Sequence, residues 1–135
     1  MSRAVPRSTP VSEPYWEGCR RGELRLQRCK DCSKLQFYPR LFCISCQGAE
    51  LAWEAVSGRG TLASYTVVRR GVSKAYPAPY VVVLVDLEEG PRLMSQLVDC
   101  DPEAVVIGAP VQVQFVQWEE GVSLPVFNLL PEEGA

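Results

Sequence analysis

The chain has 135 residues, of which 47% are hydrophobic and 22% charged, and a formal net charge of −2. This composition is typical of a globular protein, and no apolar stretch approaches the roughly 18 residues of a membrane span, so we expect no membrane partner. The acidic balance also disfavours a nucleic-acid partner, because such binding depends largely on neutralising phosphates.

The N-terminal residues 1–10 are polar, contain proline and lack the apolar core of a signal peptide. We therefore expect a disordered arm and a cytoplasmic protein, whose thiols stay reduced. Residues 11–28 are predicted to form a helix and a lead-in strand. Ser12 is a candidate helix cap and Gly22 would end the helix. Leu24 and Leu26 then alternate with polar residues, as in a strand.

Residues 29–50 are predicted to form a zinc ribbon. They hold two Cys-x-x-Cys pairs separated by ten residues, which supply Cys29, Cys32, Cys43 and Cys46. Zinc takes four ligands in a tetrahedron, and two such turns complete its shell, so we predict one structural Zn²⁺ with no open position for a substrate. A rubredoxin-like iron site is the chemical alternative, since the same tetrahedron of sulfurs suits iron.

Basic residues gather around these cysteines. The simple interpretation is that they balance an anionic metal site, and the functional one is that they form an anion-binding surface. The two cysteines outside the pairs, Cys19 and Cys100, are expected to act as small buried apolar residues. The basic residues are Arg20, Arg21, Arg25, Arg28, Lys30, Lys34 and Arg40.

Residues 51–130 show strand patterns and are predicted to form an OB-fold β-barrel. Two segments flank Ser57-Gly58-Arg59-Gly60, and the apolar run at 78–87 is expected to be a strand buried on both faces. Residues 92–98 are expected to pair back with that run as a hairpin. Glycines 58 and 60 are better explained by a turn than by a phosphate-binding loop.

The last part of the chain completes this barrel. One helical turn is expected to begin at Asp101, followed by a half-buried strand in which Val111, Val113 and Phe115 alternate with glutamines. Residues 123–130 would form an edge segment, because Pro125 bars it from a central position. This order predicts a partly open barrel, a mostly β fold class and a solvated tail at 131–135.

No histidine occurs in the chain. Its absence excludes Ser-His-Asp and Cys-His catalysis and the commonest kind of catalytic zinc. We therefore predict no catalytic residues and no reaction run by this chain alone.

The order of these features resembles the family that joins a rubredoxin-like zinc ribbon to an OB-fold, long catalogued as domain of unknown function 35. The likeness covers residues 11–130 and is carried by the ribbon followed by Ser57-Gly58-x-Gly60, Pro79-Tyr80 and Ile107-Gly108. Ser33 and Ile44 stand where members often carry glycine and proline.

The resemblance implies a non-catalytic accessory subunit of a thiolase-fold enzyme, namely a thiolase, an acyltransferase or a steroid side-chain aldolase. Such a subunit would act in a hetero-oligomer whose partner binds most of the acyl-CoA. Candidate residues for the CoA phosphates, expected near the ribbon–barrel junction, are Arg40, Arg69, Arg70 and Lys74. A nucleic-acid-binding module and a free-standing acyl-CoA-binding protein are the alternatives. Some members are fused to a hydratase-like domain, for which this chain is too short.

Overall fold

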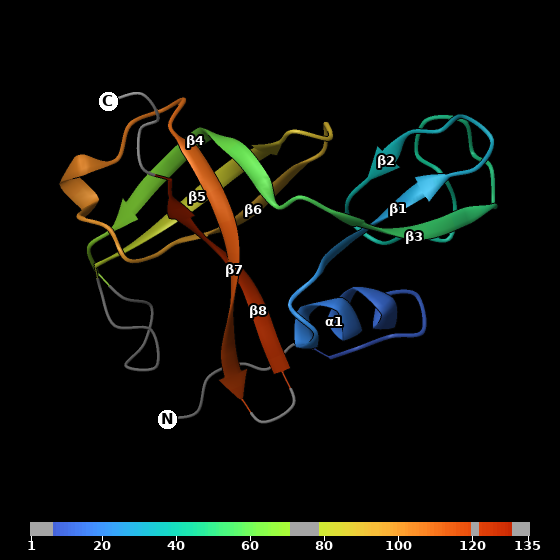
Figure 1. Ribbon diagram of the computed structural model, residues 1–135, viewed down its shortest axis with the longest axis horizontal. Coiled ribbons are helices and arrows are strands. Elements are labelled where there is room, and N and C mark those ends of the chain that lie inside the picture. The colour runs from blue at the N-terminus through green and yellow to red at the C-terminus, as the bar shows by residue number, and fades with distance from the viewer. Residues whose placement is uncertain (1–6, 71–78, 120–121, 131–135) are drawn as a thin grey trace.

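The computed structural model describes residues 7–70, 79–119 and 122–130, and it has the predicted mostly β architecture (Figure 1). None of the described helices has the length and apolar character needed to cross a membrane. The elements in chain order are α1 (Glu13–Arg20), β1 (Leu24–Cys29), β2 (Leu35–Gln36), β3 (Leu51–Val56), β4 (Arg59–Val68), β5 (Tyr80–Leu87), β6 (Arg92–Leu97), the 3₁₀ turn η1 (Pro102–Ala104), β7 (Pro110–Glu119) and β8 (Val122–Leu129).

The helix α1 begins and ends close to the predicted positions. Ser12 occupies the N-cap position, but its hydroxyl accepts from the Thr9 N–H at 3.0 Å and makes no capping bond to the helix. The Thr9 carbonyl also accepts from the N–H of Glu13 at 2.8 Å, so the end of the expected disordered arm is tied to the first helical turn. Residues 1–6 of that arm lie outside the described residues. At the other end Gly22, with φ 76°, follows the helix as predicted.

The ribbon sheet has the order β2-β1-β3. Strands β1 and β3 pair antiparallel along their full length, from Leu24 opposite Val56 to Cys29 opposite Leu51. Residues 51–56 therefore belong to the ribbon sheet by hydrogen bonding, whereas the sequence pattern had placed them at the start of the OB-fold. A strand's own side chains predict its conformation, but its partner is set by contacts far along the chain.

The barrel is closed, in the order β4-β5-β6-β8-β7, rather than partly open. The prediction that the last strand lies at an edge is wrong, because β8 lies between β6 and β7. It pairs with β7 along its length but with β6 only where Leu97 faces Phe127. Because β6 and β8 pair at so few positions, β8 tolerates Pro125, which has no N–H to donate to a neighbouring strand. The Pro125 carbonyl accepts a hydrogen bond from the Ser95 hydroxyl at 2.8 Å.

The predicted β5–β6 hairpin is confirmed, with Val81 opposite Leu97 and Asp86 opposite Arg92. The expectation that β5 is buried on both faces is wrong, since buried and half-buried residues alternate along it. The outward-facing residues of this strand are only half-buried, so its continuous apolar run gives a strand with one core face.

A single core joins the ribbon, the helix and the barrel. In Figure 1 α1 lies beneath the ribbon and beside β8, and it contacts both β1 and β8. Cys19 is 1% exposed, which confirms the prediction of a buried apolar residue, whereas Cys100, for which the same was predicted, is only half-buried. The cluster contains Tyr15, Cys19, Leu24, Leu26, Leu62, Val81, Val83, Val85, Val111 and Phe127. The ribbon is therefore anchored on the barrel through shared apolar packing.

The connection between β3 and β4 explains the paired glycines. A Cβ on Gly58 would lie 2.1 Å from Cγ1 of Val113, and a Cβ on Gly60 would lie 2.4 Å from the carbonyl oxygen of Asp86. The Ser57 N–H donates to the Glu89 carboxylate at 2.8 Å, which ties the connection to the β5–β6 turn. Glycines stand here because the backbone passes very close to neighbouring strands, as the turn interpretation requires.

We expect Gly60→Ala to lower the free energy of unfolding by about 3 kcal/mol, because its methyl group would collide with backbone that cannot rotate away. Gly22→Ala is the control, since it adds the same group where no atom lies within 4 Å. Its left-handed backbone should cost only about 1 kcal/mol. Urea unfolding measures both variants, and equal losses would contradict the close approach at residue 60.

Candidate metal centre

The two Cys-x-x-Cys pairs form turns of the same shape. In the first turn the Ser33 N–H donates to the carbonyl of Cys29 at 2.9 Å, and in the second the Gln47 N–H donates to the carbonyl of Cys43 at the same distance. Both Ser33 and Gln47 have φ 66°, in the left-handed region. Ser33 thus adopts the conformation that glycine would favour, so the chain departs from the common family residue without losing the turn.

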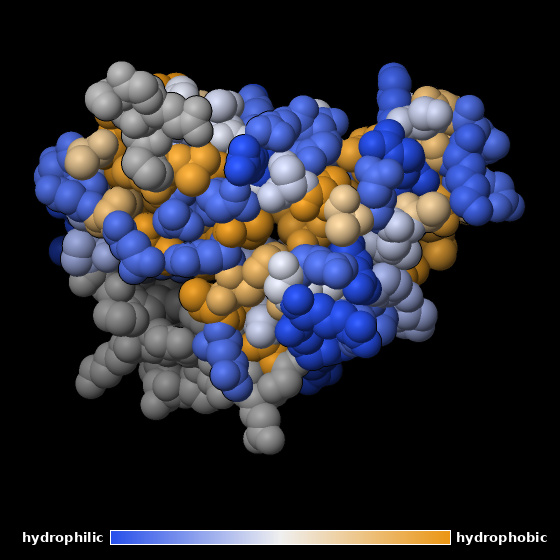
Figure 2. Space-filling model, viewed as in Figure 1, coloured by the Kyte–Doolittle hydropathy of each residue, from blue (hydrophilic) through white to orange (hydrophobic). Residues whose placement is uncertain are grey.

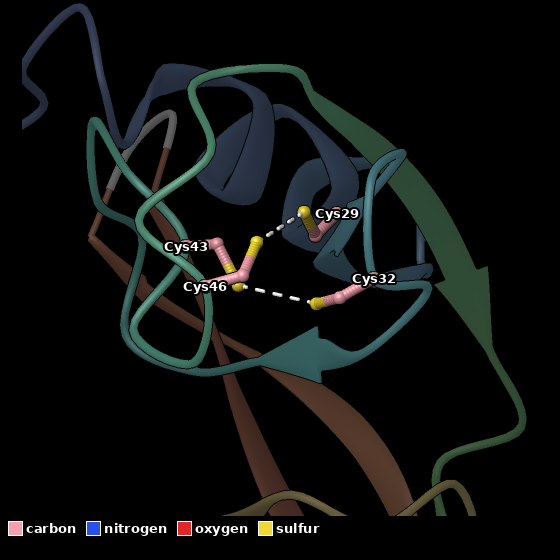
Figure 3. Close-up of side chains that lie close together, drawn as sticks. All are labelled: Cys29, Cys32, Cys43 and Cys46. Carbon is pink, nitrogen blue, oxygen red and sulfur yellow. Dashed lines mark hydrogen bonds between the residues drawn. The ribbon is translucent and has the colours of Figure 1, made fainter.

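The turns bring all four predicted ligands together. Their sulfur atoms lie within 4.8 Å of one another, with Cys29 and Cys46 3.5 Å apart and Cys32 and Cys43 also 3.5 Å apart. Figure 3 shows that each of these contacts joins one cysteine of the first pair to one of the second. Tetrahedral zinc with thiolates at about 2.3 Å spaces its sulfurs roughly 3.8 Å apart, so the cluster fits this ion.

Backbone donors favour the thiolate form of Cys43, whereas hydrogen bonds to neighbouring cysteine side chains contribute to raised pKa values for Cys32 and Cys46. The N–H groups of Cys46 and Ser45 lower the pKa of the Cys43 thiol to about 6. The Ser45 N–H lies 3.3 Å from Sγ of Cys43. Cys29 and Cys43 are buried, while Cys46 is exposed. One side of the cluster therefore faces the protein and the other faces solvent.

The basic residues near the cysteines divide into two groups. Four of them pair with glutamates, as Arg28 does with Glu54 across the β1–β3 pair at 2.7 Å. The other paired cations are Arg20, Arg21 and Arg25. Lys30, Lys34 and Arg40 are exposed and make no ion pair within residues 7–70, 79–119 and 122–130. Only these three remain for balancing the cluster or contacting an anion.

Two buried glutamines hold the loop that carries the second cysteine pair, and the sequence analysis missed them. Gln27 on β1 and Gln36 on β2 face each other and are each 4% exposed. Oε1 of Gln27 accepts from Nε2 of Gln36 and from the N–H of Arg40, both at 2.8 Å. Nε2 of Gln27 donates to the Arg40 carbonyl at 2.9 Å.

Gln36 extends this network toward the second cysteine turn. Its Oε1 accepts from the N–H of Ile44 at 2.9 Å, and its Nε2 donates to the carbonyl of Phe42 at 3.2 Å. These bonds fix the backbone on both sides of Cys43. The sequence offers no signal for this role, because Leu24 and Leu26 alternate with polar residues as in a strand with one wet face. Only the structure shows that Leu26 and Gln27 are both buried.

The four candidate CoA residues do not meet at one place. Arg40 belongs to the ribbon, whereas Arg69 and Arg70 follow the end of β4 that lies away from the ribbon, beside η1 (Figure 1). The Arg69 guanidinium pairs with the Glu103 carboxylate at 2.5 Å. Lys74 lies outside the described residues. Arg69 and Arg70 are therefore not at the ribbon–barrel junction where we expected them.

The comparisons with known proteins match both parts of this architecture. The model described as the rubredoxin-like zinc ribbon domain of ChsH2 matches residues 16–52, and that of the ChsH2 C-terminal OB-fold domain matches residues 53–116. A solved structure titled "Ltp2-ChsH2(DUF35) aldolase" superposes with a TM-score of 0.86 at 31% identity, covering 93% of this chain and 98% of that chain.

Curated relatives carry names of subunits and scaffolds. A probable enoyl-CoA hydratase alpha subunit of Thermomonospora curvata is 34% identical over 88% of this chain, which spans only 38% of that protein. A DUF35 domain-containing scaffold protein of Methanothermobacter thermautotrophicus is 36% identical over 78% of this chain and 84% of its own length. The benzoylsuccinyl-CoA thiolase subunit BbsA of Geobacter metallireducens is 31% identical over 67% of this chain and 64% of its own length.

We expect protein purified without added metal to contain one zinc per chain, because four converging thiolates should bind the ion tightly enough to retain it. Elemental analysis measures the content. Cys43→Ser should lose the ion and become poorly soluble, while Cys100→Ser, which lies outside the cluster, should keep it. Less than about half an equivalent of zinc in the unaltered chain, with no iron in its place, would contradict a zinc centre.

We expect Gln36→Leu to lower the free energy of unfolding by about 3 kcal/mol, since it leaves the Ile44 N–H, the Phe42 carbonyl and Oε1 of the buried Gln27 without their Gln36 partner. The second turn should also loosen, so the variant should release zinc to a chelator faster. Gln117→Leu, at an exposed position of β7, is the control and should change neither quantity. Zinc release at the unaltered rate would show that the glutamines do not support the metal-binding turn.

Proposed function

Because the chain belongs to the family that joins a rubredoxin-like zinc ribbon to an OB-fold, we propose that it is a non-catalytic accessory subunit. Its partner would be a thiolase-fold enzyme whose acyl-CoA chemistry it supports within a hetero-oligomer. The observation that carries this proposal is the closed cluster of four cysteines on a chain that matches relatives named as scaffolds and subunits.

The chemistry of the chain supports a structural role. Four thiolates around one zinc ion leave no position for a substrate, so we propose that Cys29, Cys32, Cys43 and Cys46 hold the ion to maintain the ribbon. Burial raises the pKa of the Cys19 thiol to about 11. Burial, followed by the nearby Asp101 carboxylate, also raises the pKa of Cys100. Neither thiol is thus prepared for nucleophilic attack.

The names of the relatives support an assembly. They include a scaffold protein, a thiolase subunit and a protein solved in an aldolase complex with Ltp2. Each name describes that relative. We infer that this chain likewise acts beside a larger enzyme. A thiolase-fold subunit is the partner that agrees best with the names of these relatives and with the expectation from the sequence. We propose the cytoplasm as its compartment, because reduced thiols are needed to bind the metal.

A direct contact with the CoA phosphates is a finer proposal. Arg40 is its best remaining candidate, because it is exposed on the ribbon and makes no ion pair within the described residues. Arg70, which follows the end of β4, remains a candidate for a separate contact, and Lys74, which lies outside the described residues, remains a candidate from the sequence alone. Arg69 is less suited to this role, since Glu103 already neutralises it.

We expect the isolated chain to have no thiolytic, acyl-transfer or retro-aldol turnover on acyl-CoA substrates, because it lacks histidine and an open metal site. Co-expression with thiolase-fold subunits of its source organism should yield a hetero-oligomer that is active. Light scattering after size-exclusion chromatography measures assembly, and a thiol-release or product assay measures turnover.

Two results would contradict this function. Turnover by the partner-free chain would show that it is itself an enzyme. Tight binding of an acyl-CoA by the chain alone in calorimetry, without assembly on any thiolase-fold subunit, would instead favour a free-standing acyl-CoA-binding protein.

A further inference from the structure

One segment of the ribbon exposes large apolar side chains. Tyr38, Leu41, Phe42 and Ile44 are 56%, 67%, 57% and 61% exposed, and we call segment 38–44, which carries these four side chains, the ribbon tip. They account for half of the eight large hydrophobic residues that are exposed in the described part of the chain, yet they lie within seven positions. Figure 2 shows apolar surface on the ribbon bordered by hydrophilic residues. Contiguous exposed apolar residues of this kind mark interaction sites on soluble proteins.

The ribbon tip is held rigidly. Its backbone is bonded at Arg40 to Gln27, and at Phe42 and Ile44 to Gln36. Cys43, in the middle of the tip, is part of the sulfur cluster. The backbone is therefore turned toward buried polar groups while the apolar side chains point to solvent. A surface fixed before binding loses little conformational entropy when a partner covers it.

One cation lies within the ribbon tip. Arg40 is exposed and makes no ion pair in the described residues. A partner that covers the tip should therefore offer an apolar hollow with an anionic group opposite Arg40. A second copy of this chain fits poorly, because a symmetric dimer centred on the tip would bring the two Arg40 side chains together.

We propose that the ribbon tip is the surface by which the chain docks on its catalytic partner. The occupant is an apolar hollow on the thiolase-fold subunit with an anionic group placed to meet Arg40, and this inference rests on the function proposed above. The metal and the two buried glutamines then serve to present the docking surface, which gives the closed cysteine cluster a purpose beyond folding.

The test compares two isoleucines of almost equal exposure. Ile44→Ser removes an apolar group from the tip, while Ile107→Ser removes the same group from the segment between η1 and β7, where Ile107 is 62% exposed. Binding is measured with the thiolase-fold subunit that assembles with the unaltered chain. Zinc content and unfolding midpoint are measured in parallel, and both should stay unchanged because the two side chains are already in solvent.

We expect Ile44→Ser to raise the Kd at least about tenfold, as is usual for an apolar residue central to an interface, and Ile107→Ser to leave it within about twofold. Phe42→Ser should act as Ile44→Ser does. Gln36→Leu keeps the four apolar side chains but removes hydrogen bonds that hold their backbone, so it should also weaken binding. This variant distinguishes the contribution of a fixed backbone from the contribution of the apolar side chains themselves.

Each contrary result has a distinct meaning. An unchanged Kd for both Ile44→Ser and Phe42→Ser would overturn the docking surface and leave the proposed function standing. Failure of the unaltered chain to assemble with any thiolase-fold subunit would overturn both. A dimer of the unaltered chain that Ile44→Ser converts to a monomer would assign the tip to a second copy and overturn the inferred occupant.

Discussion

The ribbon depends on the contact between its two cysteine turns. Residues 29–34 and 43–48 meet through sulfur atoms 3.5 Å apart, and the segment between them holds only the two-residue strand β2. So short a segment cannot bury enough apolar surface to fold by itself, and a metal ion is the usual means of stabilising such a segment. This link and the hydrogen bonds of Gln27 and Gln36 together hold the backbone from Arg40 to Ile44.

A shared apolar core connects the ribbon to the barrel. The helix α1 places Tyr15 and Cys19 in a core shared with β1 of the ribbon and with the barrel strands. The glycines at 58 and 60 let the chain pass from one sheet to the other in close contact with Val113 and Asp86. Ribbon and barrel therefore pack as one unit. Because of this packing, a partner that binds the ribbon also fixes the position of the barrel.

The sequence predicted the features that depend on local spacing. The cysteine pairs, the helix end at Gly22 and the β5–β6 hairpin are each specified by a few neighbouring residues, and the structure has all of them. It could not predict which sheet residues 51–56 would join or that β8 would close the barrel, because those choices depend on distant partners. The roles of Gln27 and Gln36 were also hidden, since glutamine is usually exposed and their hydrogen-bond partners lie up to 13 residues away.

We infer that the metal orders a surface which a catalytic partner recognises. Partner binding should be measured with zinc-loaded protein, with protein stripped by a chelator, and with stripped protein to which zinc has been returned. Stripping should abolish the complex, and added zinc should restore it. A complex of unchanged affinity after the metal has been removed would show that the docking surface does not depend on the metal.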